Sequence, residues 1–233
     1  MLCQIYVRAL CFVNSTTHES KSWNFCADPI PGNDGPKVRI VAPVCTILYV
    51  PKTCADTLSV HESIPSESNL PKDKHWTELP APGTVVLIQQ QKGQICALIG
   101  DIIATRLKLR GILGVVADGR LRDIESCANI HKDSGFQMWS RGFSAAAPSL
   151  EIKPWMINVP LQVGDLCVNP GDIICTDEAE RAIVVIPREK LQQVIAKLPA
   201  LKKASDAVLV DIENGSTLFD STGRHPDFYS NHK

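Results

Sequence analysis

The fold is decided by three consecutive segments, PGTVVLIQQ (82–90), CALIGDIIATRLKLRG (96–111) and ILGVVADG (112–119). The first and third are short runs of Val, Ile and Leu, which are typical of buried β-strands. The middle segment is longer and ends at Gly111, a residue suited to a left-handed helix terminus. We therefore expect a helix between two strands, with its apolar positions at Ile99, Ile102, Ile103, Leu107 and Leu109.

The same alternation continues on both sides of these segments. LRDIESCANI (121–130) predicts the start of a second helix, and FQMWSRG (136–142) predicts another strand. Upstream, VRIVAPVCTILYV (38–50) is β-branched and apolar, as expected of a buried strand. Strands that alternate with helices indicate βαβ units with parallel pairing, so the fold class is α/β.

The sequence pattern changes after this alternating region. Residues 156–187 contain short apolar runs separated by turn dipeptides, which predicts antiparallel strands. Residues 187–215 predict a helical tail enriched in Lys, followed by a frayed end, and the Ser- and Pro-rich residues 51–82 predict a solvent-exposed excursion. We expect three parts: a divergent N-terminal segment (1–36), a single α/β catalytic domain (37–190) and a helical C-terminal tail (191–233).

Composition narrows the class of protein. The chain has 233 residues, of which 44% are hydrophobic and 21% charged, as in an ordinary globular protein. Its formal net charge of −1 gives no electrostatic basis for a dedicated nucleic-acid binder. The 9 cysteines include no CxxC pair and lie mostly in apolar runs, so we expect reduced core thiols. The histidines show no metal-ligand spacing, which disfavours a zinc site.

The start of the chain, MLCQIYVRALCFV (1–13), superficially resembles a signal peptide. Arg8 interrupts its apolar run, and no small-residue cleavage site follows. No apolar run approaches the ~20 residues that a membrane-spanning helix needs. We therefore expect a cytoplasmic protein without a membrane partner.

Two loops after apolar segments carry the candidate chemistry. Gly100 permits close approach to the backbone, and the N–H groups that follow it could bind a carboxylate at a helix N-terminus. Arg122 offers a bidentate fork for the same anion or for an enolate oxygen. Asp123 supplies a hard oxygen ligand for Mg²⁺ or Mn²⁺, and Asp101 could hydrogen-bond to metal-bound water. The alternative is a surface helix cap or salt bridge formed by Arg122 and Asp123.

Other polar residues receive structural interpretations. Ser144 lies in no GxSxG frame and has no assigned base, so we expect it to be structural. Asp177, Glu178 and Glu180 lie in the sequence DEAERA, where we expect a solvated turn rather than an acid–base pair.

Two motifs together suggest a family. G-[DE]-x-x-A-T matches residues 100–105, DGxxRD matches residues 118–123, and SRGFSAAAP (140–148) follows them. In this order the segments resemble the RraA-like family, and the chain looks most like its fungal branch. That family includes 4-hydroxy-4-methyl-2-oxoglutarate aldolases, oxaloacetate decarboxylases and regulators of ribonuclease activity. The resemblance covers roughly residues 39–187.

The resemblance implies a compact β/β/α swivelling-type fold that assembles as homotrimers or hexamers with active sites between subunits. It also implies a role for each candidate residue. Substrate carboxylate would bind the backbone of Gly100, Asp101, Ile102 and Ile103, while Arg122 would contact the substrate. The divalent metal would bind Asp123, and Asp101 would position metal-bound water for proton transfer.

The expected function is that of a metal-dependent lyase for a small 2-oxo acid. Cleavage of a C–C bond, by retro-aldol reaction or decarboxylation, would leave a pyruvate enolate stabilised by Arg122 and the metal. Two alternatives remain. The scaffold could serve a tailoring step in fungal secondary metabolism, or the protein could be a non-catalytic RraA-like binding protein.

Overall fold

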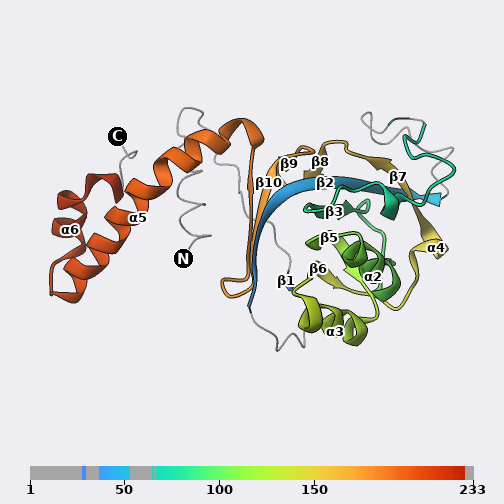
Figure 1. Ribbon diagram of the computed structural model, residues 1–233, viewed down its shortest axis with the longest axis horizontal. Helices are drawn as coiled ribbons and strands as arrows, with labels where there is room; N and C mark the ends of the chain where they lie inside the picture. The colour runs from blue at the N-terminus through green and yellow to red at the C-terminus, as the bar shows by residue number, and fades with distance from the viewer. Residues whose placement is uncertain (1–27, 30–36, 53–64, 66, 229–233) are drawn as a thin grey trace.

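The computed structural model describes residues 28–29, 37–52, 65 and 67–228. Its main feature is a 9-stranded sheet in the order β1-β6-β5-β3-β2-β10-β11, with β4 paired to β5 and β7 paired to β2 (Figure 1). The strands of this sheet are β1 (Asp28–Pro29), β2 (Arg39–Pro51), β3 (Val85–Gln89), β4 (Ala97–Ile99), β5 (Gly114–Leu121), β6 (Gln137–Phe143), β7 (Ile152–Ile157), β10 (Ile173–Asp177) and β11 (Ala182–Ile186). A separate two-stranded sheet pairs β8 (Leu161–Val163) with β9 (Leu166–Val168).

The centre of the large sheet is parallel, as the alternating sequence pattern predicted. β2 pairs in parallel with β3, β3 with β5, and β5 with β6. Four consecutive residues of β3, from Val85 to Ile88, are buried, because layers cover both faces of the sheet and neither face of the strand meets water. The expected α/β class is confirmed.

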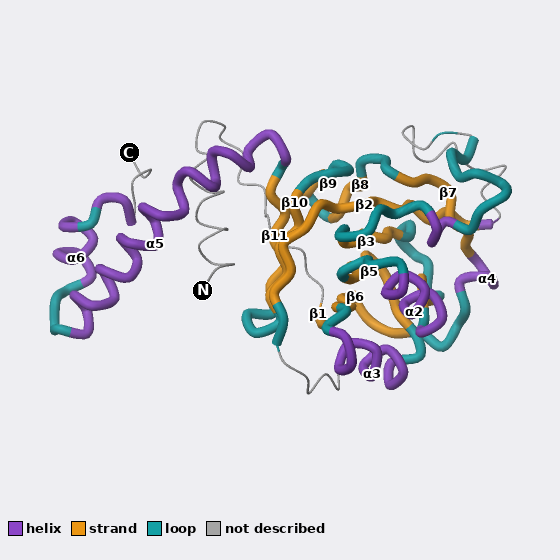
Figure 2. The backbone as a smooth tube through the Cα atoms, in the orientation of Figure 1, coloured by secondary structure: helices purple, strands orange, loops and turns teal. Residues whose placement is uncertain are grey.

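Different elements cover the two faces of the sheet (Figures 1 and 2). Helices α2 (Asp101–Leu109) and α3 (Ile124–Ser134) lie on one face, where Leu107 and Cys127 join the hydrophobic core. On the other face a second core surrounds Trp139, and it includes side chains of the β8–β9 pair and of strands β7, β10 and β11 of the same sheet. The expected antiparallel texture is confirmed by the β8–β9 and β10–β11 pairs.

The helix expected over 96–111 begins later than the sequence indicated. Ile99 belongs to the short strand β4 rather than to the helix, and α2 begins at Asp101. Ile102 and Leu109 are 73% and 70% exposed, so the prediction that they supply core positions is wrong. The error arises because β4 and α2 are separated only by Gly100, and their apolar residues merge into one run in the sequence.

The expected exposed excursion between 51 and 82 lies partly outside the described residues. Within the described part, the 3₁₀ helix η3 (Trp76–Glu78) buries Trp76 in the core, where its ring meets Tyr49 edge-on at 6.2 Å. Glu78 then pairs with Arg106 and Arg110 of α2. This part of the segment is therefore docked on the domain, which corrects the expectation.

The turn between β10 and β11 is also not simply solvated. Asp177 and Glu178 are 2% and 4% exposed. Asp177 accepts a hydrogen bond from Arg39, and Glu178 accepts one from the Val38 backbone N–H at 3.1 Å. The expectation of a solvated turn is wrong for these two carboxylates because residues far away in the chain supply their partners.

The C-terminal part forms an arm that projects from the sheet (Figure 1). The expected tail helix is α5 (Leu191–Glu213), whose first half packs Val194 and Leu201 against the β10–β11 hairpin. It continues into α6 (Leu218–Arg224) and η5 (Pro226–Phe228), so the expected frayed end is wrong up to residue 228. Within the described residues, we find no helix with the length and apolar character needed to cross a membrane.

Most cysteines of the described residues lie in the interior, as expected. Cys45, Cys96 and Cys127 are buried thiols, Cys175 is buried, and Cys167 is exposed. The predictions for Cys3, Cys11, Cys26 and Cys54 lie outside the described residues.

Candidate active site

Neighbouring strands β4, β5 and β6 end at the same edge of the sheet. The parallel register aligns Ile99 of β4 and Phe143 of β6 with Leu121 of β5. Beyond these pairs, the Arg122 N–H donates to Ile99 O at 3.1 Å, and the Ser144 N–H donates to Leu121 O at 2.9 Å. The residues after all three strands are therefore held side by side, at the edge where open α/β sheets bind ligands.

The turn after β4 is the N-terminus of α2. Gly100 is its N-cap residue, in an extended conformation, and no side chain caps the helix. The first intrahelical bond runs from the Ala104 N–H to Gly100 O at 3.0 Å. The N–H groups at the start of a helix have no carbonyl partner within it, so those of Asp101, Ile102 and Ile103 are suited to bind an anion.

The turn after β5 places Asp123 in a strained conformation. Asp123 is the N-cap residue of α3 and adopts left-handed dihedrals, φ 56° and ψ 48°. For a residue other than glycine this conformation costs about 1 kcal/mol or more, although Asp tolerates it better than most. The Asp123 side chain makes no capping hydrogen bond. The helix-cap alternative therefore does not explain this aspartate.

Asp123 instead lies against the start of α2. A Cβ atom added to Gly100 would be 2.2 Å from Asp123 Oδ2 and 2.9 Å from Arg122 Cγ. No side chain could occupy that space without displacing the carboxylate. Glycine at position 100 is thus what allows the anion-binding turn and the Arg122–Asp123 pair to meet.

Arg122 is held close to Asp123 but keeps hydrogen-bonding capacity. Its Nε lies 3.3 Å from Asp123 Oδ2, so the salt-bridge alternative is realised in part. That Nε is buried, and among the described residues it has no hydrogen-bond partner of acceptable geometry. A buried donor without a partner is costly, and a bound anion or polarised oxygen would satisfy it.

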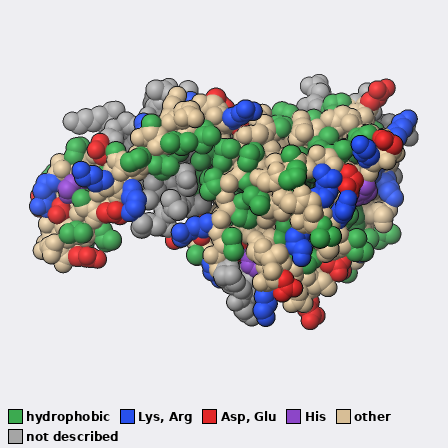
Figure 3. All heavy atoms as spheres, in the orientation of Figure 1, with side chains coloured by type: hydrophobic (Ala, Val, Ile, Leu, Met, Phe, Trp, Pro, Cys, Tyr) green, Lys and Arg blue, Asp and Glu red, His purple; other side chains and the backbone are tan. Residues whose placement is uncertain are grey.

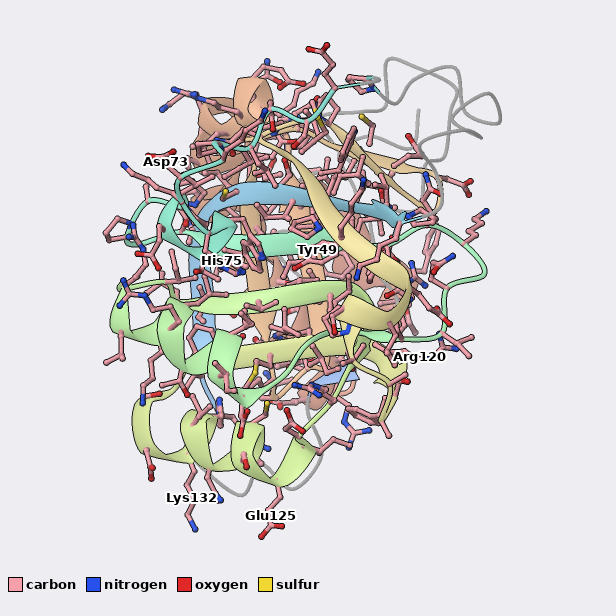
Figure 4. All side chains as sticks on the ribbon, turned by 90° about the vertical axis from the view of Figure 1, so that its right-hand side faces the viewer. Tyr49, Asp73, His75, Arg120, Glu125 and Lys132 are labelled. Carbon is pink, nitrogen blue, oxygen red and sulfur yellow. The ribbon has the colours of Figure 1, made fainter. Side chains whose placement is uncertain are left out.

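Arg122 and Asp123 line an open pocket of about 470 Å³. The remaining lining residues are Leu121, Ile124, Phe143, Ser144 and Ala145. In Figure 4, the labelled Arg120 of β5 and Glu125 of α3 mark the elements on either side of the Arg122–Asp123 turn. The sequence interpretation did not place Phe143, Ser144 or Ala145 in the site, and it expected Ser144 to be structural. Their signal was their position at the end of a parallel strand, next to the strand that carries Arg122.

The surroundings of these two turns change the pKa of the nearby Cys127 thiol. Burial, together with the nearby negative charges of Asp101 and Asp123, raises the pKa of the Cys127 thiol to about 12. Its backbone N–H donates to Asp123 O at 2.9 Å. Both carboxylates therefore act on the same buried group.

The donor set fits a hard divalent cation with few protein ligands. Asp123 offers an oxygen that makes no helix-capping bond, and Mg²⁺ is commonly held by one or two carboxylates plus water and substrate oxygens. Across the described part of the chain, no three His, Cys, Asp or Glu side chains gather in a metal-binding group. A cation at Asp123 would thus depend on water and substrate for its other ligands.

Comparison with known proteins identifies relatives of this chain. The chain is 34% identical over 126 residues to "Putative 4-hydroxy-4-methyl-2-oxoglutarate aldolase" of Halalkalibacterium halodurans, covering 54% of this chain and 56% of the relative. It is 26% identical over 182 residues to Protein DlpA of Legionella pneumophila, covering 78% of this chain and 27% of the relative. The matches thus span about half of the length of the first relative and about a quarter of the length of the second.

Solved structures show the same fold at low identity. An uncharacterized protein from Pseudomonas syringae superposes with a TM-score of 0.68 at 20% identity, over 94% of this chain and 90% of that one. Streptomyces coelicolor RraAS2, an unusual member of the RNase ES inhibitor RraA family, gives 0.62 at 20% identity, with 88% and 89% covered. A family model described as RraA-like, Aldolase/RraA, matches residues 27–185. This chain therefore belongs to the RraA-like family.

Proposed function

We propose that this protein is a divalent-metal-dependent lyase that cleaves a C–C bond of a small 2-oxo acid. The substrates would be 4-hydroxy-4-methyl-2-oxoglutarate-type aldols, oxaloacetate, or both. The observation that carries this proposal is the contact between Gly100 and Asp123. It joins an uncapped helix N-terminus, an arginine with an unsatisfied Nε and a carboxylate that does not cap its own helix.

Each residue has a part in binding the 2-oxo acid. The N–H groups of Asp101, Ile102 and Ile103 would bind the substrate carboxylate. Arg122 would donate to the 2-oxo oxygen and stabilise the negative charge that develops on it. Asp123 would hold Mg²⁺ or Mn²⁺, which when bound supplies a Lewis acid for the same oxygen.

Proton transfer would distinguish the two reactions. In retro-aldol cleavage the substrate hydroxyl must lose a proton as the C–C bond breaks, and a water held by Asp101 would accept it. In decarboxylation the departing carboxylate is already deprotonated, so no base is needed. In both reactions the resulting enolate takes up a proton at carbon to become pyruvate.

Self-assembly as a homotrimer or hexamer is part of the proposal. The pocket is open. Large apolar side chains are exposed along the α5–α6 arm, and Figure 3 shows hydrophobic side chains over α5. These exposed residues are Ile195, Leu209, Val210, Ile212, Leu218 and Phe219. A second copy of the chain could cover such a surface.

The test is pyruvate release from oxaloacetate with added Mg²⁺ or Mn²⁺, compared with EDTA-treated protein. The matched variant is Asp123→Asn, because asparagine also tolerates the left-handed conformation and removes only the charge. We expect metal-dependent release that falls by orders of magnitude in Asp123→Asn while the melting temperature is kept. Spontaneous and metal-catalysed decarboxylation is subtracted using a reaction without protein.

Other outcomes would identify the alternatives. Calorimetric titration with Mn²⁺ should detect binding to the wild type and weaker binding to Asp123→Asn. Metal binding without release from oxaloacetate or an aldol substrate would favour a scaffold recruited to another reaction. Absence of Mn²⁺ binding in folded protein would contradict the lyase proposal and favour a non-catalytic binding protein.

A further inference from the structure

We propose that Ser144 and Phe143, at the end of β6, select the substrate by contacting the fragment that leaves when the C–C bond breaks. The inference rests on the proposed function, since it takes the 2-oxo acid end to be bound near α2. It assigns a role to two pocket residues that the chemistry at Asp123 and Arg122 does not use.

The order of the strands gives the direction of the substrate. At this edge β5 lies between β4 and β6, because it pairs with both. The anion-binding turn follows β4, the Arg122–Asp123 turn follows β5, and Phe143–Ala145 follow or end β6. A 2-oxo acid whose carboxylate lies at α2 and whose keto oxygen lies at Arg122 can therefore extend its remaining carbons toward β6, where Phe143 and Ser144 line the same pocket.

Ser144 can offer a hydroxyl proton at that end. Its Oγ accepts a hydrogen bond from the Ala146 N–H at 3.2 Å, and its own N–H is used by Leu121 O. The Oγ–H has no acceptor among the residues that the structure describes, and the side chain lines the pocket. A hydroxyl that accepts one bond still has one proton to donate. A carboxylate or carbonyl oxygen on the leaving fragment would accept that proton.

The Phe143 side chain restricts which substrate groups can bind beside the Ser144 hydroxyl. Its side chain is 40% exposed, although it aligns with the fully buried Leu121 across the strand pair. A large, partly exposed ring in the wall of a pocket supplies an apolar surface next to a single polar donor. The ligand class is thus a 2-oxo acid whose leaving fragment has an oxygen acceptor and, beside it, a small apolar group.

The experiment compares two ligands of different length on Ser144→Ala. Oxaloacetate has a leaving carboxylate, whereas oxalate has only the oxygens that would bind at α2 and Arg122. We expect Ser144→Ala to raise KM for oxaloacetate roughly ten- to a hundred-fold without lowering kcat, because the hydrogen bond holds the charged carboxylate of the bound substrate and weakens as that group leaves as CO₂. Its inhibition constant for oxalate, measured with metal in large excess, should stay within about two-fold of the wild type.

Three further variants make the result specific. Ser144→Thr keeps the hydroxyl and should restore most of the oxaloacetate activity. Ser149→Ala, at an exposed position of the neighbouring helix α4 (Pro148–Glu151), should leave both constants unchanged. Phe143→Ala should raise the relative rate for aldols with a bulkier group at the cleaved carbon.

The outcomes separate this inference from the proposed function. If the wild type releases no pyruvate from either substrate class, the lyase proposal fails and takes this inference with it. If the wild type is active and Ser144→Ala retains its oxaloacetate KM, only the inference is overturned. Equal weakening of oxalate and oxaloacetate would also overturn it, because that pattern indicates a structural role for the Ser144–Ala146 turn.

Discussion

Gly100 and Asp123 lie so close together that a Cβ atom on Gly100 would fall 2.2 Å from Asp123 Oδ2. The two residues come from different βα turns. The backbone of Gly100 is extended rather than left-handed. The requirement for glycine at this position is therefore one of space, not of dihedral angle.

Gly100→Ala should abolish activity while the protein stays folded. The methyl group must displace the Asp123 carboxylate, and a shift of about 1 Å in a catalytic group can cost 10²-fold in rate. We expect at least that loss in metal-dependent pyruvate release. The matched control is Gly223→Ala in α6, where an added Cβ meets nothing within 4 Å. Unchanged activity in Gly100→Ala would contradict the assignment of this corner as the active site.

Arg122→Lys should reduce kcat/KM about 10²-fold or more with little change in stability. Lysine keeps the charge but loses the planar fork and the Nε donor, which has no hydrogen-bond partner of good geometry in the described structure. Arg120→Lys is the control, because Arg120 bonds Gln94 O at 2.8 Å and does not line the pocket. Similar losses of kcat/KM in both variants would indicate a general effect of basic residues at the end of β5. That result would contradict a specific role of Arg122 in substrate binding.

The Glu78 ion pairs should make stability depend on pH in the acid range. Hydrogen bonds from Arg106 and then Arg110 lower the pKa of Glu78 from 4.5 to about 2. A carboxyl whose pKa is lower in the folded state contributes stability above its unfolded pKa and loses it as pH falls toward the folded value. The gap in melting temperature between wild type and Glu78→Gln should thus be constant above about pH 5 and vanish near pH 2.

A control is needed because acid protonates every carboxylate. Glu125→Gln, at an exposed position in the first turn of α3, should show a much smaller pH-dependent gap than Glu78→Gln. If the Glu78→Gln gap were the same at pH 2 and pH 6, the ion pairs with α2 would contribute nothing measurable to stability.

The cysteines should differ sharply in reactivity. Alkylation depends on exposure and on the thiolate, and Cys127 is 1% exposed with a pKa raised to about 12. Cys167 is exposed. Treatment of the native protein with iodoacetamide at pH 7.5, followed by peptide mass mapping, should find Cys167 modified and Cys127 unmodified until denaturant is added. Rapid modification of Cys127 in native protein would show that the active-site corner opens readily.

Much of the central architecture was predictable from the sequence. The apolar runs that became β2, β3, β5 and β6 predicted buried parallel strands, because hydrophobic periodicity is a local property. The boundary between β4 and α2 was missed, since a three-residue strand ending at Gly100 leaves no periodic signal of its own. Propensity cannot separate two apolar elements that adjoin without a polar break.

The candidate residues were chosen from the sequence, but their relation was not visible there. Gly100, Arg122 and Asp123 stood out by residue type and motif, and a surface helix cap remained an alternative explanation for the last two. Tertiary structure removed that explanation by showing an aspartate at a helix start that makes no cap bond and lies against Gly100. Such a contact depends on how two helices pack on one sheet.

For some residues, tertiary structure alone decided whether the side chain is buried or lines the pocket. Their contact partners lie far away in the chain. Asp177 and Glu178 read as a solvated turn, yet they are buried against Arg39 and Val38. Ser144 stood in no catalytic motif, yet β6 ends beside β5 and places it in the pocket. The sequence by itself determined which segments are strands and helices, because that information is local. Only the fold decided which side chains share a site, because burial and proximity depend on contacts between distant residues.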